Sequence, residues 1–197
     1  LDALAQPFIF QHAEESPPTG GAGPMIEAGV LENPKVDAIF GLHVFPGLVG
    51  SVTYVSGPAL ASGDNYKIIV HGRQTHGALP WAGVDPIVVG SQIVLGLQTI
   101  VSRQVDLSSA NAIVPVGAFN AGNRTNIIPD SAVLIGTVRT FDEHVRREIH
   151  ARIKRTAEGI AQSAGARVTV QTDLGYPVTV NDPALTARMV ATLQRMA

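Results

Sequence analysis

Two adjacent carboxylates at the end of an apolar run are the residues of this sequence with the most distinctive chemistry. Glu14 and Glu15 follow the run from Pro7 to Phe10 and precede a loop rich in proline and glycine. Adjacent side chains of an extended chain point in different directions, so the two carboxylates can have different partners. Such a pair is most often solvated. It can also supply the metal ligand and the general base that metal-assisted hydrolysis needs.

A histidine at the end of a second apolar run adds a possible nitrogen ligand. His43 follows residues 36–42, which are almost all apolar. A histidine in this position is more often a hydrogen-bonded core residue, but a carboxylate at the end of a neighbouring strand favours a metal ligand. The sequence has no cysteine, so a metal site here would use oxygen and nitrogen ligands, which suit Zn²⁺, Mn²⁺ or Co²⁺.

Three later residues have side chains that suit a substrate better than a metal. His76 lies in a predicted loop, either as an ordinary exposed histidine or as an N–H donor to an oxyanion. Asn126 is either a turn residue or a substrate contact. Arg139 ends a predicted strand, where it would either pair with Asp142 or Glu143 or grip a substrate carboxylate.

We expect the remaining histidines to be structural or surface residues. His144 and His150 fall in a charge-rich amphipathic helix, where a solvated face is expected. Arg146 belongs to the basic residues that the same periodicity places mostly on that face. His71 ends a predicted strand, and His12 stands next to the two glutamates without a role that its position alone predicts.

The elements expected to position the glutamates and His43 form an α/β arrangement. Apolar runs predict strands over residues 7–11, 36–43 and 51–55, with a short helix over residues 24–29. The run over residues 36–43 is nearly continuous rather than alternating, which is typical of a sheet that is covered on both faces.

The pattern changes after a predicted linker at residues 56–63. The later residues alternate or show helical periodicity. The predicted order is β-α-β-β-α-β, over residues 66–71, 85–103, 111–119, 131–141, 142–163 and 167–172. This order is that of the ferredoxin-like fold. A further helix starts near residues 181–183 and is expected to return to the first domain.

Composition excludes several classes of protein and partner. The chain has 197 residues, of which 45% are hydrophobic and 15% charged, so it can bury a core. A net charge of −2 gives no reason to expect nucleic acid or an anionic membrane as partner. No apolar run approaches the roughly 20 residues of a membrane span. The lack of cysteine fits a cytoplasmic protein. Both ends of the sequence are typical of a fragment of a longer chain.

Several segments together resemble the M20 metallopeptidase family. The resemblance is to its amidohydrolase branch of hippurate hydrolases, N-acyl-amino-acid deacylases and auxin-conjugate hydrolases. The similar segments are residues 10–15, 41–46, 75–80 with 85–87, 97–103, 126–130 and 136–141. They come in the family's order and cover nearly the whole chain, which makes them far more specific together than singly.

The resemblance implies a fold and a domain organisation. Family members have a zinc-peptidase-like catalytic domain into which a ferredoxin-like lid, or dimerisation domain, is inserted. Residues 1–61 would then belong to the catalytic domain, residues 62–177 to the lid, and residues 178–197 to the catalytic domain again.

The resemblance also implies roles for the candidate residues. Glu14 would be the general base, and Glu15 and His43 would be ligands of a site for two divalent metal ions. His76 would reach into the active site of the partner subunit of a homodimer and stabilise the oxyanion. The implied reaction is hydrolysis of an N-acyl amino acid or a related small amide by metal-activated water.

Asn126 and Arg139 would bind the carboxylate or amide end of that substrate. Two departures from the family pattern matter. His12 replaces a proline, and the chain lacks segments that carry other ligands, whereas a catalytic zinc site uses about three protein ligands. A catalytically inactive dimerisation module is therefore the alternative function. An aminoacyl dipeptide or a succinylated amino acid is the alternative substrate.

Overall fold

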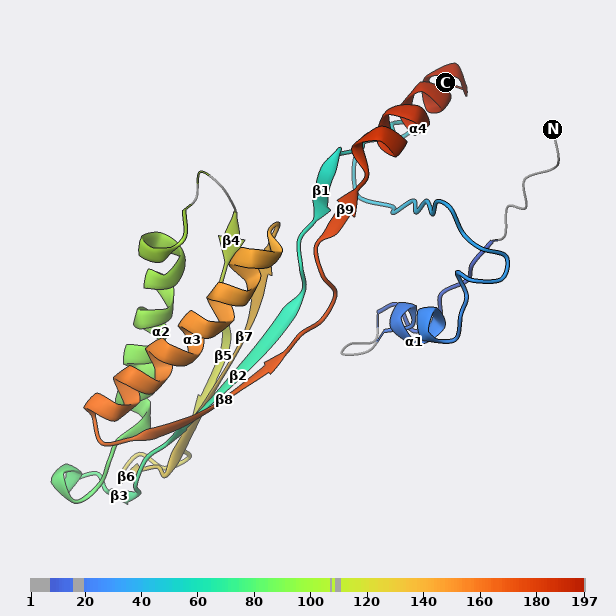
Figure 1. Ribbon diagram of the computed structural model, residues 1–197. Helices are drawn as coiled ribbons and strands as arrows, with labels where there is room; N and C mark the ends of the chain where they lie inside the picture. The colour runs from blue at the N-terminus through green and yellow to red at the C-terminus, as the bar shows by residue number, and fades with distance from the viewer. Residues whose placement is uncertain (1–7, 16–19, 107, 109–110, 197) are drawn as a thin grey trace. The chain divides into compact units, whose positions relative to one another are not determined.

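The computed structural model describes residues 8–15, 20–106, 108 and 111–196, and the chain has a mixed α/β fold (Figure 1). Its contacts divide it into two compact units, residues 1–53 and 54–197. The domain limits expected at residues 61 and 177 stay a prediction.

The smaller unit has one helix and, among residues 8–15 and 20–53, no strand. Helix α1 spans Ala22–Glu27, close to the predicted range. The expected strands over 7–11, 36–43 and 51–55 were wrong for their described residues, since the single bridge there joins Glu32 to Lys35. An extended chain becomes a strand only when a neighbour satisfies its N–H and C=O groups, and sequence periodicity does not show whether that neighbour is present.

The apolar side chains of these segments are exposed in this chain. The exposed fraction is 90% for Phe8, 87% for Phe10 and 84% for Leu42. One close contact in the smaller unit requires glycine. A side chain at position 21 would collide with the carbonyl oxygen of His12, so Gly21 allows its backbone to lie against the segment that carries the glutamates.

The larger unit contains an antiparallel five-stranded sheet. Strand β7 (Ser131–Thr140) pairs with β2 (Asp64–His71), which pairs with β8 (Arg167–Asp173). The other edge of β7 pairs with β4 (Ala112–Ile113) and β5 (Val116–Ala121). Helices α2 (Pro86–Gln104) and α3 (Glu143–Ser163) cover one face of this sheet (Figure 1). The predicted β-α-β-β-α-β order of elements is therefore present.

Both long helices begin where the sequence predicts caps. The Asp85 carboxylate accepts hydrogen bonds from the backbone N–H groups of Ile87 (2.8 Å) and Val88 (3.3 Å). The Asp142 carboxylate does the same for His144 and Val145, both at 2.8 Å. Each carboxylate satisfies backbone donors that have no partner inside the helix.

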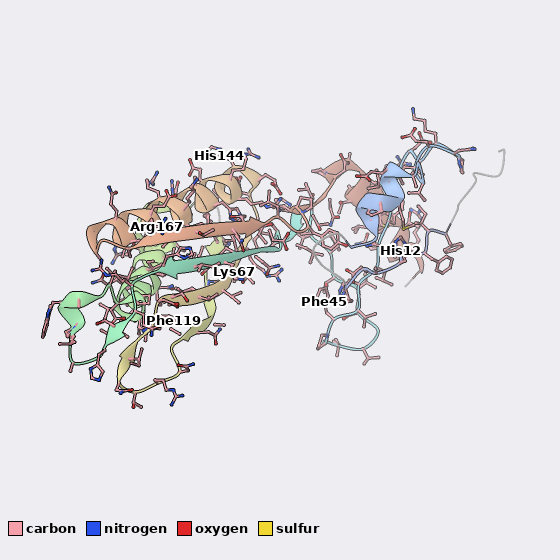
Figure 2. The ribbon with its side chains drawn as sticks, turned by 90° about the horizontal axis from the view of Figure 1, so that it is seen from below. His12, Phe45, Lys67, Phe119, His144 and Arg167 are labelled. Atoms are coloured by element: carbon pink, nitrogen blue, oxygen red, sulfur yellow. The ribbon has the colours of Figure 1, made fainter. Side chains whose placement is uncertain are left out.

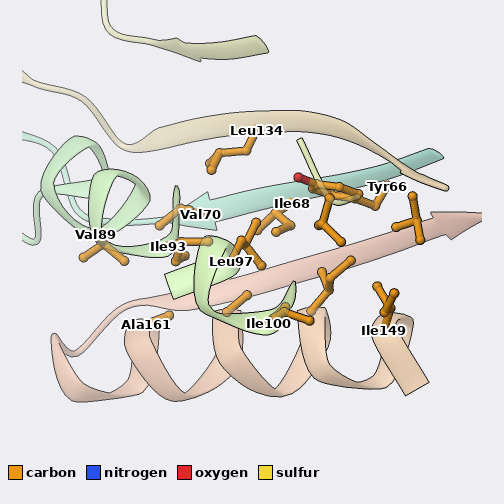
Figure 3. Close-up of a cluster of buried hydrophobic side chains, with 14 of the residues drawn as sticks. Tyr66, Ile68, Val70, Val89, Ile93, Leu97, Ile100, Leu134, Ile149 and Ala161 are labelled. Carbon is orange, nitrogen blue, oxygen red and sulfur yellow. The ribbon is translucent and has the colours of Figure 1, made fainter. Parts of the chain in front are cut away.

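The core lies between the sheet and the two helices (Figure 3). Alternate residues of β2, Tyr66, Ile68 and Val70, are buried against the helices, as a period of two requires. Burial raises the pKa of Tyr66 to about 12, and its hydroxyl donates to the carbonyl of Pro115 at 2.9 Å. A Cβ at Gly136 would collide with the Tyr66 ring, so only glycine at position 136 leaves room for this side chain.

Helix α2 is also apolar enough to be compared with a membrane span. Its most apolar stretch of 18 residues has a mean hydropathy of 1.2, so by length and composition alone α2 could cross a membrane. Its inward side chains, including Ile93, Leu97 and Ile100, are fully buried in the core (Figure 3). We therefore assign α2 as a core helix of the larger unit.

Two short strand pairs lie at opposite ends of the five-stranded sheet (Figure 1). Strand β1 (Gly57–Leu60) pairs with β9 (Thr179–Asn181), so part of the predicted linker is a strand. Strand β3 (Thr75–His76) pairs with β6 (Ile127–Ile128). A 3₁₀ turn at Pro80–Ala82 follows β3, and helix α4 (Pro183–Met196) starts where the sequence predicts it.

The prediction that Arg146 and His150 lie on a solvated face of α3 was wrong. Arg146 is only 7% exposed, and its Nε donates to the Asp64 carboxylate at 2.8 Å. His150 lies 2.9 Å from the same carboxylate through Nε2. Burial of Asp64 would raise its pKa, but the hydrogen bonds from Arg146 and His150 outweigh burial and lower the pKa below its ordinary value. His144, by contrast, is exposed on α3 as predicted (Figure 2).

Hydrogen bonds hold the two chain segments that join the five-stranded sheet to β1 and β9, and the Asp64 carboxylate accepts one of them. Asp64 accepts from the N–H of Gly175 at 3.1 Å, and Arg146 donates to the carbonyl of Gly175 at 3.1 Å. Glu143 accepts from the N–H of Val178 at 2.8 Å. The N–H of Gly63 donates to the carbonyl of Tyr176 at 3.0 Å. The joint is therefore hydrogen-bonded across both segments, not a free linker.

Replacement of Arg146 by methionine should strongly destabilise the chain. It leaves the buried Asp64 carboxylate without its main partner, and breaking such a pair costs about 3–5 kcal/mol. Lys154→Met is the matched control, because Lys154 is exposed on the same helix and should change stability by less than about 1 kcal/mol. Urea unfolding measures both free energies. A loss below about 1 kcal/mol for Arg146→Met would show that the pair is unimportant.

Candidate active-site residues

Glu14 and Glu15 are exposed and lie in a turn. The turn follows Ala13, whose φ of 51° is in the left-handed region. Their predicted roles as general base and metal ligand are therefore consistent with access to a metal and to water.

His43 has a local contact that fixes which ring nitrogen carries the proton. Its Nδ1 lies 2.9 Å from the carbonyl oxygen of Val44, and its ring stacks on Phe45 with centroids 4.2 Å apart. A carbonyl oxygen only accepts hydrogen bonds, so Nδ1 is the protonated nitrogen. In the neutral ring, Nε2 then has a free lone pair, which is the form that binds a metal.

The candidate ligands of the described residues form only part of a metal site. Across residues 8–15, 20–106, 108 and 111–196, no group of three His, Asp or Glu side chains comes close enough to hold an ion. A catalytic zinc site uses about three protein ligands. Glu15 and His43 suit an ion that prefers oxygen and nitrogen, but they do not complete a site with the other described residues.

His76 and Asn126 are brought together by the pairing of β3 with β6. His76 is opposite Ile127, and the N–H of Gly77 donates to the carbonyl oxygen of Asn126 at 2.8 Å. A Cβ at Gly77 would lie 3.2 Å from that oxygen, so glycine suits the close approach. Both candidate side chains are exposed at this end of the sheet.

The ring of His76 has the opposite tautomer to that of His43. Its Nδ1 accepts a hydrogen bond from the N–H of Ala78 at 3.1 Å. Since Nδ1 is the acceptor, the proton of the neutral ring is on Nε2. His76 can therefore donate a hydrogen bond from Nε2 while neutral, as an oxyanion requires.

Arg139 does not form the ion pairs that its sequence position suggests. Asp142 caps α3, and Glu143 pairs with Arg146 at 3.1 Å. Arg139 is exposed near the end of β7 and lies close to Gly63. A Cβ added at Gly63 would be 3.2 Å from Nη1 of Arg139. Among the residues that the structure describes, no ion pair involves Arg139, so its guanidinium is available to an anion.

Arg139 lies at the opposite end of the sheet from His76 and Asn126. Ser131, at the start of β7, is close in sequence to Asn126, and eight residues of extended chain separate Ser131 from Arg139. At about 3.3 Å per residue, this is about 26 Å. The structure thus brings His76 and Asn126 together and keeps Arg139 away from them within one chain.

A hollow of about 400 Å³ lies beside the strand pair that carries His76. It is lined by Gln74, Gly122, Asn123, Arg124, Ile127, Pro129, Asp130 and Ser131. Sequence reasoning selected none of these residues. Most of these residues lie outside the strands, so strand periodicity gave no signal for them.

The two histidines should show opposite tautomers in solution. When the rings are neutral, His43 should carry its proton on Nδ1 and His76 on Nε2, because Val44 accepts from one ring and Ala78 donates to the other. Long-range ¹H–¹⁵N spectra separate the two forms, and His43→Gln and His76→Gln assign the signals. Averaged nitrogen shifts for His43 or His76 would contradict the fixed contact at that ring.

Comparison with known proteins places these residues in a family. The chain matches the family described as "Peptidase family M20/M25/M40" over residues 6–197. It is 41% identical over 180 residues to an N-acetyl-L-cysteine deacetylase of Bacillus subtilis, a match that covers 91% of this chain and 42% of that protein. It is 40% identical over 176 residues to a hippurate hydrolase of Campylobacter jejuni, with coverage of 89% and 45%.

A solved structure agrees with this comparison. The YXEP protein of Bacillus subtilis, described as a dinuclear metal binding peptidase from the M20 family, has a TM-score of 0.75 and 34% sequence identity. The match covers 95% of this chain and 46% of that one. This chain thus spans less than half the length of these relatives. It belongs to the M20 peptidase family, whose members among its relatives are named amidohydrolases, deacetylases and hydrolases.

Proposed function

We propose that the protein to which this chain belongs is a metal-dependent amidohydrolase of N-acyl amino acids or related small amides. The observation that carries the proposal is the family match over residues 6–197, together with relatives named for the removal of acyl groups from amino acids. The candidate residues supply a carboxylate pair, an imidazole lone pair and an imidazole donor, which are the groups that this hydrolysis needs.

The smaller unit would hold the catalytic carboxylates. Glu14 would accept the proton of the attacking water and pass it to the leaving nitrogen. Glu15, through its carboxylate, and His43, through Nε2, would be two of the ligands, and other parts of the protein would supply the rest. When bound, two divalent ions, Zn²⁺, Mn²⁺ or Co²⁺, would polarise the water and the scissile carbonyl.

Residues 62–177 of the larger unit would be the ferredoxin-like lid. Its sheet has β2, β5, β7 and β8 with α2 and α3 on one face, which supports that description. The pairing of β1 with β9 brings residues 57 and 181 side by side, so the chain would enter and leave the unit at one end. An inserted domain needs this arrangement, since both of its connections lead to the same neighbour.

His76, Asn126 and Arg139 would serve one substrate in a homodimer. The two ends of β7 are about 26 Å apart, which is longer than a small amide. His76 and Asn126 of one copy would therefore contact the substrate beside Glu14 of the other copy. Arg139 would hold the carboxylate or amide end of the substrate.

One surface of the larger unit suits contact with a second copy. Helix α2 has no charged residue before Arg103, and Val88 and Leu95 on its outer side are 54% and 71% exposed. An exposed helix face without charge is typical of an interface between copies.

Replacement of Glu14 by glutamine should remove most of the activity. The amide cannot accept the proton, and loss of a general base costs about 10²- to 10⁴-fold in kcat. The whole protein, loaded with Zn²⁺, Mn²⁺ or Co²⁺, would be assayed for free amino acid released from N-acetyl and N-benzoyl amino acids. Glu32→Gln is the surface control. Activity that survives both Glu14→Gln and exhaustive chelation would contradict the metal-water mechanism. A wild-type protein that hydrolyses none of these substrates would favour the inactive dimerisation module.

Two inactive variants should restore activity when they share a dimer. His76→Ala removes the oxyanion donor and Glu14→Gln removes the base, so each homodimer is inactive. A mixed dimer has one site with both groups if His76 acts across the interface. After unfolding and refolding of an equal mixture, roughly a quarter of wild-type activity should return. Activity no higher than that of either variant alone would show that Glu14 and His76 act within one chain.

A further inference from the structure

We infer that Trp81 contacts the acyl group of the substrate and gives the enzyme a preference for large apolar acyl groups. This inference rests on the proposed function, since it takes His76 as the donor to the oxyanion, and it names a specificity contact that the resemblance does not imply. It depends on three properties of the described residues: the exposure of Trp81, the hydrogen bonds that tie its turn to His76, and the lack of charge around it.

Trp81 has the most exposed aromatic ring among the Phe, Tyr and Trp residues described in the larger unit. Its exposed fraction is 77%. Within the part of the chain that the structure describes, no hydrogen bond, ion pair or ring contact involves this side chain. Tryptophan combines a large apolar area with few rotatable bonds, and it is enriched where a protein binds a partner or a ligand. The indole of Trp81 is therefore free to contact a ligand.

Two hydrogen bonds tie the turn that carries Trp81 to His76. The N–H of Leu79 donates to the carbonyl of His76 at 2.8 Å, and the N–H of Ala78 donates to its Nδ1 at 3.1 Å. The Cα atoms at the two ends of such a turn are less than about 7 Å apart. Trp81 stands two residues further, in the 3₁₀ turn, where each residue adds about 2 Å. One small substrate can therefore contact both side chains.

The loop that carries His76 and the 3₁₀ turn is closed at its base. Arg73 and Val84 exchange backbone hydrogen bonds of 2.9 and 3.0 Å. A Cβ at Gly83 would lie 2.5 Å from Cγ2 of Thr75, so the end of the turn packs against β3. The backbone of Trp81 is thus held in place before a ligand binds, which lowers the entropy that a specific contact costs.

The chemistry at His76 identifies the acyl chain as the part of the substrate that reaches this loop. The oxyanion forms on the carbonyl carbon, to which both the leaving nitrogen and the acyl chain are bonded. The nitrogen leads to the carboxylate or amide end that Arg139 would hold, so the acyl chain is left to meet the loop. Residues 74–84 include no Asp, Glu, Lys or Arg, and the loop therefore offers apolar surface and no charge. A benzoyl ring can stack on an indole.

The test measures kcat/KM of the whole metal-loaded protein for the N-formyl, N-acetyl and N-benzoyl forms of one amino acid. Trp81→Ala should lower kcat/KM for the N-benzoyl compound by about tenfold or more and change that for the N-formyl compound by less than about twofold. Trp81→Phe should keep most of the preference, because a phenyl ring also stacks. Arg155→Ala, on the exposed side of α3, is the control and should change none of these values.

A binding measurement separates this inference from the proposed function. An N-nitrobenzoyl amino acid quenches the fluorescence of a tryptophan that it contacts. It should therefore quench the Glu14→Gln protein more than the protein that carries both Glu14→Gln and Trp81→Phe, and the absence of the base keeps the compound intact. If the wild type hydrolyses none of the compounds, the proposed function fails, whereas this difference in quenching still supports the contact with Trp81.

Two outcomes would overturn the inference. One is a Trp81→Ala protein that keeps the wild-type ratio of kcat/KM between the N-benzoyl and N-formyl compounds. If that protein also sediments as a monomer, Trp81 belongs to the contact between the two copies instead. The other outcome is equal quenching of the two proteins that carry Glu14→Gln.

Discussion

The buried ion pair between Asp64 and Arg146 is the interaction on which the larger unit depends. Two charges removed from water are tolerated only when nearly every donor and acceptor is satisfied. Here His150, Glu143 and the backbone of Gly175 complete that set. The pair links the first residue of β2 to the first turns of α3. It also fixes the chain after β8, so both segments that leave the sheet do so at one place.

The five-stranded sheet connects the joint at Asp64 to the strand pair that carries His76. The Asp64 joint occupies one end of β2, and the chain that follows the other end carries His76. Between them lies a core of fully buried side chains such as Ile68 and Leu134, which resists bending because it is close-packed. Arg139 lies next to the joint, because Val138 is opposite Asp64, so the close-packed core holds Arg139 and His76 apart within one chain.

The sequence predicted the elements whose signals are local and missed those that need a distant partner. Asp85 and Asp142 cap their helices as expected because a cap and its backbone donors lie within three residues. Arg146 was placed on a solvated face because helical periodicity cannot show that Asp64, 82 residues away, lies beneath it. The strands expected before residue 56 failed for the same reason. An apolar run predicts an extended chain, whereas pairing depends on another segment.

In the candidate site, too, the sequence predicted the residues of interest but not the contacts of their single atoms. The sequence indicated His43 and His76 as residues of interest, but it could not say which nitrogen of each ring carries the proton. In both cases the answer comes from the adjacent backbone: a carbonyl that accepts from Nδ1 of His43, and an N–H that donates to Nδ1 of His76. These contacts leave a lone pair on one Nε2 and a proton on the other. A metal ligand needs the first and an oxyanion donor needs the second, so neighbouring peptide groups suit the same side chain to opposite roles.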